Sequence, residues 1–90
     1  MIFGVLGWVF VEDKKECAGS KIKTGSFPFV ADCAAKCEGI SAMFIFGTND
    51  YGRNRCKDQD CDCYCETSAS IYGSCNQQSH DGFRLYKYGK

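Results

Sequence analysis

The sequence predicts an α+β fold, a small disulfide-rich domain in which one helix packs on an antiparallel sheet. Three observations support this prediction: eight cysteines in 90 residues, one well-delimited helix pattern, and several short runs of β-branched, aromatic or alternating residues. Cysteine at this density is typical of a disulfide scaffold, and an even number fits four bridges. Short strands with a single helix on one face give an α+β architecture.

The length of 90 residues predicts one domain, spanning residues 1–90. A core this small gives little stability by itself, whereas each disulfide typically adds about 2–4 kcal/mol. Disulfides persist in oxidising compartments, so we expect a secreted or extracellular protein.

The charge and hydropathy patterns restrict the partners. Eleven basic and eleven acidic residues cancel, which argues against general nucleic-acid binding, because that requires a basic excess. Residues 2–11 are apolar, but this stretch is too short to span a bilayer as a helix and lacks the flanks of a signal peptide. We expect a mature domain with an added initiator Met1 and no membrane insertion. The apolar segment Met1–Gly7 would pack locally or support self-association.

The first half of the chain begins with a predicted strand over Val5–Glu12, which is rich in β-branched and aromatic residues. A polar turn over Asp13–Lys15 is expected before Cys17. Residues 18–26 are then expected to form a loop around a short strand at Lys21–Thr24.

A helix is predicted next, because its start and stop signals are both present. Ser26 is a candidate N-cap, Pro28 fits the first turn, and Gly39 fits the position just after the last turn. Cys33 and Cys37 are four residues apart, so they lie on the same, buried face of this helix.

The second half of the chain predicts three strands and two loops. Ala42–Phe46 is apolar enough for a buried strand, and residues 48–60 form a loop rich in turn residues. Cys61–Cys65 alternates, so a strand there places its three cysteines on one face. Residues 66–82 form a second loop before an alternating closing strand at Phe83–Tyr88.

The cysteine spacing connects the helix to the strand Cys61–Cys65. One helical turn separates Cys33 from Cys37, and alternate strand residues lie about 6.5 Å apart, so the two spacings nearly match. Two disulfides can therefore join one face of the helix to one face of the strand.

These residues resemble a known family. The segment FPFVADCAAKCEGISAMFIFG is similar to the helix and following strand of the PAN/Apple superfamily, in which a helix with two cysteines is bridged to a central strand of a small antiparallel sheet. The strand before Cys17 and the closing FRLYKY strand suit the same plan, and the resemblance covers a core of about residues 8–88. With three further cysteines, at 61, 63 and 65, the sequence is more similar to cysteine-rich invertebrate members of the superfamily, such as leech antiplatelet proteins.

Spacing and resemblance together constrain the bridges without fixing them. Cys33 and Cys37 are expected to pair with two of the three strand cysteines. The remaining strand cysteine and Cys17, Cys56 and Cys75 are expected to pair among themselves. Eight cysteines allow 105 pairings, so the exact set stays open.

Metal binding and catalysis are the main rivals to a binding module. C-x-C-x-C is a thiolate spacing, but thiolate clusters occur in reduced, aromatic-poor chains, and the C-x-x-C spacing of structural zinc is missing. Asp58, Asp60 and Asp62 have the two-residue spacing of a calcium loop, but its glycine and final glutamate are missing. His80 is the single histidine, and with every cysteine bridged it lacks a thiolate to activate. We therefore expect no metal, no cofactor and no enzyme activity.

The two loops are the expected binding surface, because loops on a rigid scaffold often carry function. Tyrosine and arginine are frequent at interface hot spots, and tyrosine beside amides suits a sugar. The candidate ligand-binding residues are Asn49, Asp50, Tyr51, Arg53, Arg55 and Tyr72.

The resemblance implies recognition of an extracellular protein or glycan. Two alternatives stay open: a secreted effector, such as a toxin, anticoagulant or host-defence protein, and a structural or adhesive matrix component.

Overall fold

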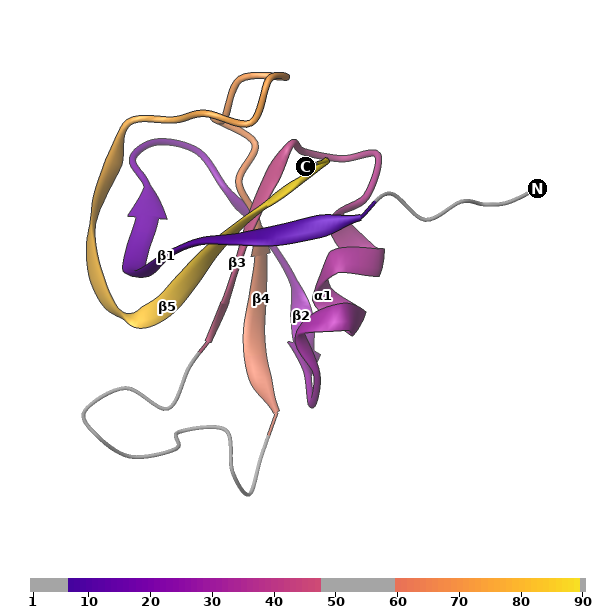
Figure 1. Ribbon diagram of the computed structural model, residues 1–90. Coiled ribbons are helices and arrows are strands. Elements are labelled where there is room, and N and C mark those ends of the chain that lie inside the picture. The colour runs from indigo at the N-terminus through magenta and orange to yellow at the C-terminus, as the bar shows by residue number, and fades with distance from the viewer. Residues whose placement is uncertain (1–6, 48–59, 90) are drawn as a thin grey trace.

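The computed structural model describes residues 7–47 and 60–89, and it shows one helix against a five-stranded antiparallel sheet (Figure 1). The elements are β1 (Trp8–Cys17), β2 (Ile22–Phe27), α1 (Val30–Cys37), β3 (Met43–Gly47), β4 (Cys61–Cys65) and β5 (Gln77–Tyr88). The strand order is β1-β5-β3-β4-β2, with every neighbouring pair antiparallel. The predicted α+β class, with one helix on an antiparallel sheet, is confirmed.

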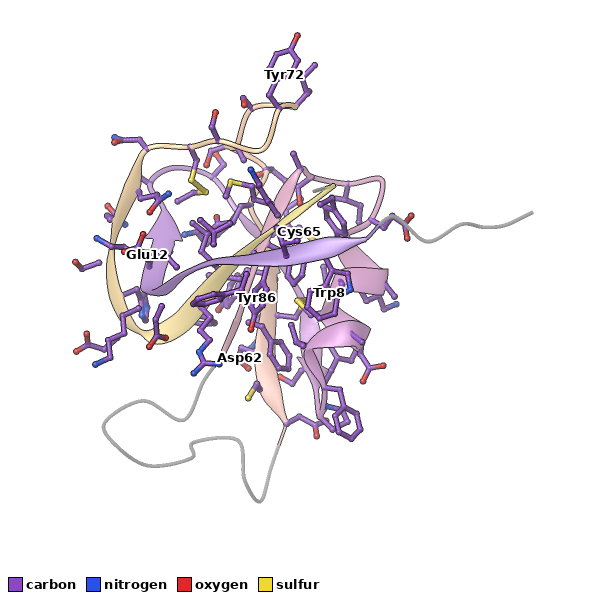
Figure 2. All side chains as sticks on the ribbon, viewed as in Figure 1. Trp8, Glu12, Asp62, Cys65, Tyr72 and Tyr86 are labelled. Carbon is purple, nitrogen blue, oxygen red and sulfur yellow. A yellow bond between two sulfur atoms is a disulfide. The ribbon has the colours of Figure 1, made fainter. Side chains whose placement is uncertain are left out.

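One face of the sheet carries the helix, which packs against β2, β3 and β4. Because side chains alternate along a strand, Phe44 and Phe46 of β3 point to this face. Phe44 is fully buried, and the ring of Tyr86 stacks on it at 5.1 Å between centroids. Trp8 meets Tyr86 edge-on at 5.7 Å, so aromatic rings continue this core from the helix toward β1 (Figure 2).

The opposite face of the sheet carries a second core. Met43, Ile45 and Leu85 are buried there together with Cys17, and Cys75 packs beside them. The cover on this side is the irregular segment of residues 66–76, which links β4 to β5. We call this face the loop face and the other the helix face.

Three disulfides have both cysteines in the described residues: Cys33–Cys63, Cys37–Cys65 and Cys17–Cys75. The first two confirm that the helix cysteines pair with two of the three strand cysteines. The third confirms a pairing among the remaining ones. Cys61 is also disulfide-bonded, whereas Cys56 lies outside the described residues.

The first strand differs from its prediction. Asp13, Lys14 and Lys15, expected as a turn, belong to β1, which continues to Cys17. The polar residues stay in the strand because the ladder with β5 absorbs register shifts at Phe10/Glu12 and at Asp13/Lys15. Lys14 has a φ of 57°, so the irregularity that the polar run signals is a bulge and not a reversal.

The helix start also differs. Ser26 lies in β2, and the N-cap position is Phe29, which makes no side-chain capping bond. The Ser26 hydroxyl instead donates to Asp62 on the neighbouring β4, at 2.8 Å. Gly39 follows the helix with a φ of 84°, the left-handed conformation expected just after a last helical turn.

The remaining strands follow the prediction with shifted bounds. β2 is longer than Lys21–Thr24, β3 begins one residue after Ala42, and β4 has the expected bounds. The largest change is β5, which begins at Gln77, so the last six residues of the predicted second loop are strand and His80 lies among them. Pairing of Gln77, Gln78 and Ser79 with the far end of β1 makes this polar stretch extended.

Candidate functional site

Of the six predicted ligand-binding residues, the structure describes Tyr72. Asn49, Asp50, Tyr51, Arg53 and Arg55 lie outside the described residues, as do Met1 to Leu6 of the apolar N-terminal segment. Tyr72 is 86 % exposed and stands at the outer end of the 66–76 segment (Figure 2). The candidate site is therefore built around this segment.

The 66–76 segment is anchored at both ends. At its end, Cys75 is bridged to Cys17, and the neighbouring Ala18 amide donates to the Asn76 carbonyl at 2.7 Å. At its start, the Glu66 amide donates to the Met43 carbonyl at 2.9 Å. These bonds join the segment to β1 and β3, so it is held by the sheet beneath it.

A buried ionic cluster strengthens the start of the segment. The Glu66 side chain is fully buried, and its Oε2 accepts the Cys17 amide at 2.9 Å. Lys21 Nζ lies 2.6 Å from Glu16 Oε1 and 3.4 Å from Glu66 Oε1. One lysine therefore connects two carboxylates from different parts of the chain.

The two carboxylates of this cluster have pKa values shifted in opposite directions. Burial raises the pKa of Glu66 above its ordinary value of 4.5, and the bonds from Cys17 and Lys21 offset this only in part. Burial also acts to raise the pKa of Glu16, but hydrogen bonds from Lys21 and Gln78 outweigh it and hold this pKa below 4.5.

The middle of the segment is held by hydrogen bonds within the segment and by packing against the loop that contains Gly19. Ser70 receives the Gly73 amide on its carbonyl at 3.0 Å and donates its own amide to the Ser74 carbonyl at 2.8 Å. Ser68 packs so closely on Gly19 that a Cβ at Gly19 would lie 2.9 Å from the Ser68 Cβ. Gly19 also has a φ of 107°, so both space and backbone favour glycine at this contact.

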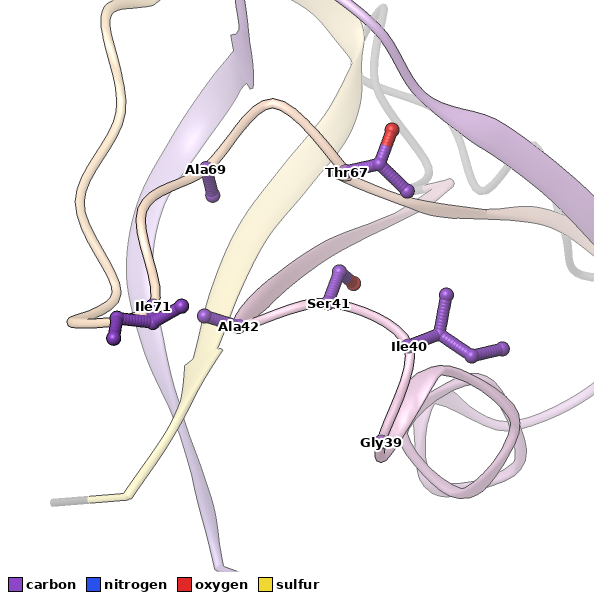
Figure 3. Close-up of a pocket in the computed structure, with 7 residues that line it drawn as sticks. All are labelled: Gly39, Ile40, Ser41, Ala42, Thr67, Ala69 and Ile71. Atoms are coloured by element: carbon purple, nitrogen blue, oxygen red, sulfur yellow. The ribbon is translucent and has the colours of Figure 1, made fainter.

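The braced segment forms one wall of an open groove, which we call the Ile71 groove. Its other wall is the turn from α1 into β3. Two adjoining hollows of about 370 and 270 Å³ make up the groove and share Gly39, Ser41, Ala42 and Ile71. Figure 3 shows Ile71 and Ala42 pointing toward each other, with Ile40 on the far side next to the helix. The lining residues are Gly39, Ile40, Ser41, Ala42, Thr67, Ala69, Ile71, Tyr72, Gly73, Tyr88 and Gly89.

Large side chains are exposed along this groove. Ile71 is 84 % exposed, and Ile40 is 52 % exposed. Sequence reasoning identified Tyr72 but missed both isoleucines and the anchoring Glu66. The signal for Ile71 was present, because an Ile-Tyr pair stands alone in a run of small residues (TSASIYGS). Ile40 had no such signal, since it follows the helix stop in sequence and reaches the groove only through folding.

The residues considered for catalysis do not converge. Ser79, His80 and Asp81 are consecutive in β5, where the pairing with β1 is irregular, and within the described residues no hydrogen bond joins their side chains. The Nδ1 atom of His80 accepts the Gly82 amide at 3.1 Å, and its ring packs edge-on against Phe83.

The residues considered for metal binding have other partners. The Sγ atoms of Cys33, Cys37 and Cys63 lie within 4.8 Å of one another, but all three belong to disulfides and are not thiolate ligands. Of the predicted calcium trio, Asp62 accepts from Ser26 and pairs with Lys23 at 3.5 Å. Asp60 is exposed, and Asp58 lies outside the described residues.

No protein-family model matches the chain, and no curated protein or solved structure matches it either. Within residues 7–47 and 60–89, no helix is both long and apolar enough to cross a membrane. Several disulfides in a small domain are typical of extracellular proteins.

Proposed function

We propose that this protein is a secreted, non-enzymatic binding module with a PAN/Apple-like fold that recognises an extracellular protein or glycan through the Ile71 groove. The observation that carries the proposal is the exposure of Ile71 and Tyr72, 84 % and 86 %, on a segment that is otherwise tied down. Large exposed side chains on a fixed segment bind with a small ordering cost, because little conformational freedom is left to lose.

The cysteine framework supports the proposed PAN/Apple-like fold and the proposed secretion of the protein. A helix bridged twice to β4, an interior strand of the sheet, has the plan that the PAN/Apple resemblance implies. The geometry around His80 supports a non-enzymatic role, because its Nδ1 atom already accepts the Gly82 amide and its ring packs against Phe83.

The proposal is tested by measuring binding with paired variants. The purified domain is screened by surface plasmon resonance against immobilised extracellular-matrix proteins and a glycan array. For any ligand found, Ile71→Ala and Tyr72→Ala are each expected to weaken binding at least about tenfold, the effect typical of a residue at the centre of an interface.

Phe29→Ala is the matched control. Phe29 is also a large exposed side chain, 69 % exposed, but it precedes α1, whereas the groove begins after the helix. Its removal is expected to leave affinity within about twofold, the size of effect of a near-neutral contact. Equal losses for all three variants, or no loss at Ile71 and Tyr72, would place the binding surface elsewhere.

A further inference from the structure

We propose that the Cys17–Cys75 disulfide is a redox modification site, which a dithiol reductant opens while the two bridges of the helix face stay closed. Opening it detaches the 66–76 segment and removes one wall of the Ile71 groove. The proposal goes beyond the proposed function, because it concerns the chemistry of this bridge and requires no ligand in the groove. It follows from the exposure of the cysteines, the hydrogen bonds of the segment and the elements that cover each bridge.

The three bridges whose cysteines are both described differ in how far a reductant can reach them. All four cysteines of the helix-face bridges are fully buried. On the loop face, Cys17 is equally buried, but Cys75 is partly exposed. Thiol–disulfide exchange begins when a thiolate reaches one of the two sulfur atoms, so its rate depends on access. Cys75 is therefore the point of attack in the folded protein.

The segment that carries Cys75 is joined to the rest of the domain mainly at its ends. Among the described residues, the hydrogen bonds of residues 69–75 run to other members of the 66–76 segment. Hydrogen bonds that leave the segment come from residues 66–68 and from Asn76. Between these ends, the disulfide at Cys75 is the covalent connection to β1. Breaking it leaves the middle of the segment held only by packing.

The helix-face bridges require a larger rearrangement before they can be reduced. They join α1 to β4 inside a core that also contains Phe44 and Tyr86. A reductant reaches their sulfur atoms only after the helix separates from the sheet, which amounts to unfolding this core. An irregular segment opens locally, and local opening requires less free energy than global unfolding. The loop-face bridge is therefore reduced first.

The reaction is balanced for a dithiol reductant, such as dithiothreitol or an oxidoreductase with a Cys-x-x-Cys motif. One thiolate of the reductant attacks the Cys75 Sγ atom and forms a mixed disulfide, and the sulfur–sulfur bond to Cys17 breaks. Cys17 leaves as a thiolate, which takes a proton from water. The second thiolate of the reductant then closes its own disulfide and releases Cys75. The two cysteines are reduced to thiols, and the dithiol is oxidised to a disulfide.

The test is partial reduction of the native domain with dithiothreitol. Samples are quenched at intervals with an excess of N-ethylmaleimide in denaturant, and the labelled cysteines are identified by mass spectrometry of proteolytic peptides. We expect Cys17 and Cys75 to be labelled together, at least about tenfold faster than the helix-face cysteines, because local opening is more frequent than unfolding. Equal rates for the three bridges, or earlier labelling of the helix-face cysteines, would overturn the proposal.

The same reaction in guanidinium chloride is the control. Unfolding exposes every bridge to the reductant, so the preference for Cys17–Cys75 is expected to disappear. A preference of the same size in the unfolded chain would assign it to the neighbouring sequence and contradict a site made by the fold.

A second measurement follows the segment by hydrogen exchange after selective reduction and alkylation. The amides of Ser70 and Tyr72, which are bonded inside the segment, are expected to exchange at least about tenfold faster than in the oxidised domain. Those of Ile40 and Ser41, in the other wall of the groove, are expected to keep their rates, because both donate to the Cys37 carbonyl. Unchanged exchange at Ser70 and Tyr72 would show that reduction leaves the segment in place.

A variant without alkyl groups separates the loss of the bridge from the bulk of the label. Cys17→Ser with Cys75→Ser is expected to give the same exchange pattern as the reduced and alkylated domain. Exchange rates in this variant that match those of the oxidised domain would attribute the detachment to the label and overturn the role of the bridge.

Discussion

On the helix face of the sheet, two disulfides close 28 and 30 residues of chain, whereas on the loop face one disulfide closes 58. The helix-face bridges join two regular elements whose cysteine spacings match. The loop-face bridge holds an irregular segment that also relies on Glu66, Lys21 and backbone hydrogen bonds.

The difference shows that, in this small domain, one face of the sheet supplies most of the stability and the other face presents exposed side chains. The helix face buries Phe44 among aromatic rings and disulfides, so a substitution in this packed core is expected to lower the stability of the protein. The loop face buries a smaller core and carries exposed side chains on its cover. Substitutions on the helix face should therefore unfold the whole protein. Substitutions on the loop face should first detach the 66–76 segment, which forms one wall of the groove.

The largest effect is expected from removing both helix-face bridges. Replacing Cys33, Cys37, Cys63 and Cys65 with alanine should lower the free energy of unfolding by about 4–8 kcal/mol, since each of the two bridges typically contributes about 2–4 kcal/mol. That exceeds the reserve of many small domains, so far-UV circular dichroism at 25 °C should show an unfolded chain. A variant that keeps its native spectrum would show that the aromatic core suffices without the bridges.

A smaller effect is expected from the loop-face bridge. Cys17→Ala with Cys75→Ala should lower the free energy of unfolding by about 2–4 kcal/mol in urea titrations. Hydrogen exchange should become faster at Ala69 and Gly73, whose amides lie in the released segment, while Cys37 in α1 keeps its protection. Equal acceleration in both places would contradict a separation between the two faces.

The contributions of the two carboxylates of the ionic cluster to folding stability depend on pH in opposite directions. Because the folded pKa of Glu66 lies above 4.5, the folded state binds more protons there, and its contribution to stability is lost as pH rises through that pKa. The folded pKa of Glu16 lies below 4.5, so its contribution is present above 4.5 and is lost as pH falls through the folded pKa.

Glutamine variants separate these contributions in urea titrations between pH 3 and pH 8. Relative to the unmodified protein, Glu66→Gln should gain stability as pH rises, and Glu16→Gln should lose it, each by on the order of 1 kcal/mol, a common size for single substitutions. The same sign for both variants would contradict the assigned shifts.

The smallest effect is expected from one hydroxyl that ties the sheet to the helix. The Tyr88 hydroxyl donates to the Ala34 carbonyl, and burial together with the Glu38 charge raises the Tyr88 pKa. Tyr88→Phe should lower the free energy of unfolding by about 1 kcal/mol, the net worth of one hydrogen bond. Tyr72→Phe is the control, because Tyr72 is exposed and should leave stability unchanged.

The helix-face half of the fold was accessible from the sequence, because it depends on local periodicity. The four-residue spacing of Cys33 and Cys37 and the alternation through Cys61–Cys65 predicted which faces meet. Helix-stop reasoning was also correct at Gly39, where backbone conformation is a local property. Helix-start reasoning was wrong at Ser26, because a neighbouring strand offered its hydroxyl a partner that the helix did not.

The candidate site was accessible only in part. Tyr72 could be singled out as an aromatic residue in a loop, but Ile40 and Ile71 come from segments about thirty residues apart and meet only after folding. The polar start of β5 was predicted as loop because propensity favoured it, and pairing with β1 overrode that preference.

The amino-acid sequence alone determined the disulfide scaffold, the α+β class and the face of the helix that is buried, because the first follows from the number of cysteines and the other two follow from local residue patterns. Tertiary structure decided which cysteine pairs with which, the burial of Glu66 beneath Lys21, and the groove between two distant turns. Those features depend on distances across the sheet, and the free energy that selects them comes from packing between segments that no local pattern connects.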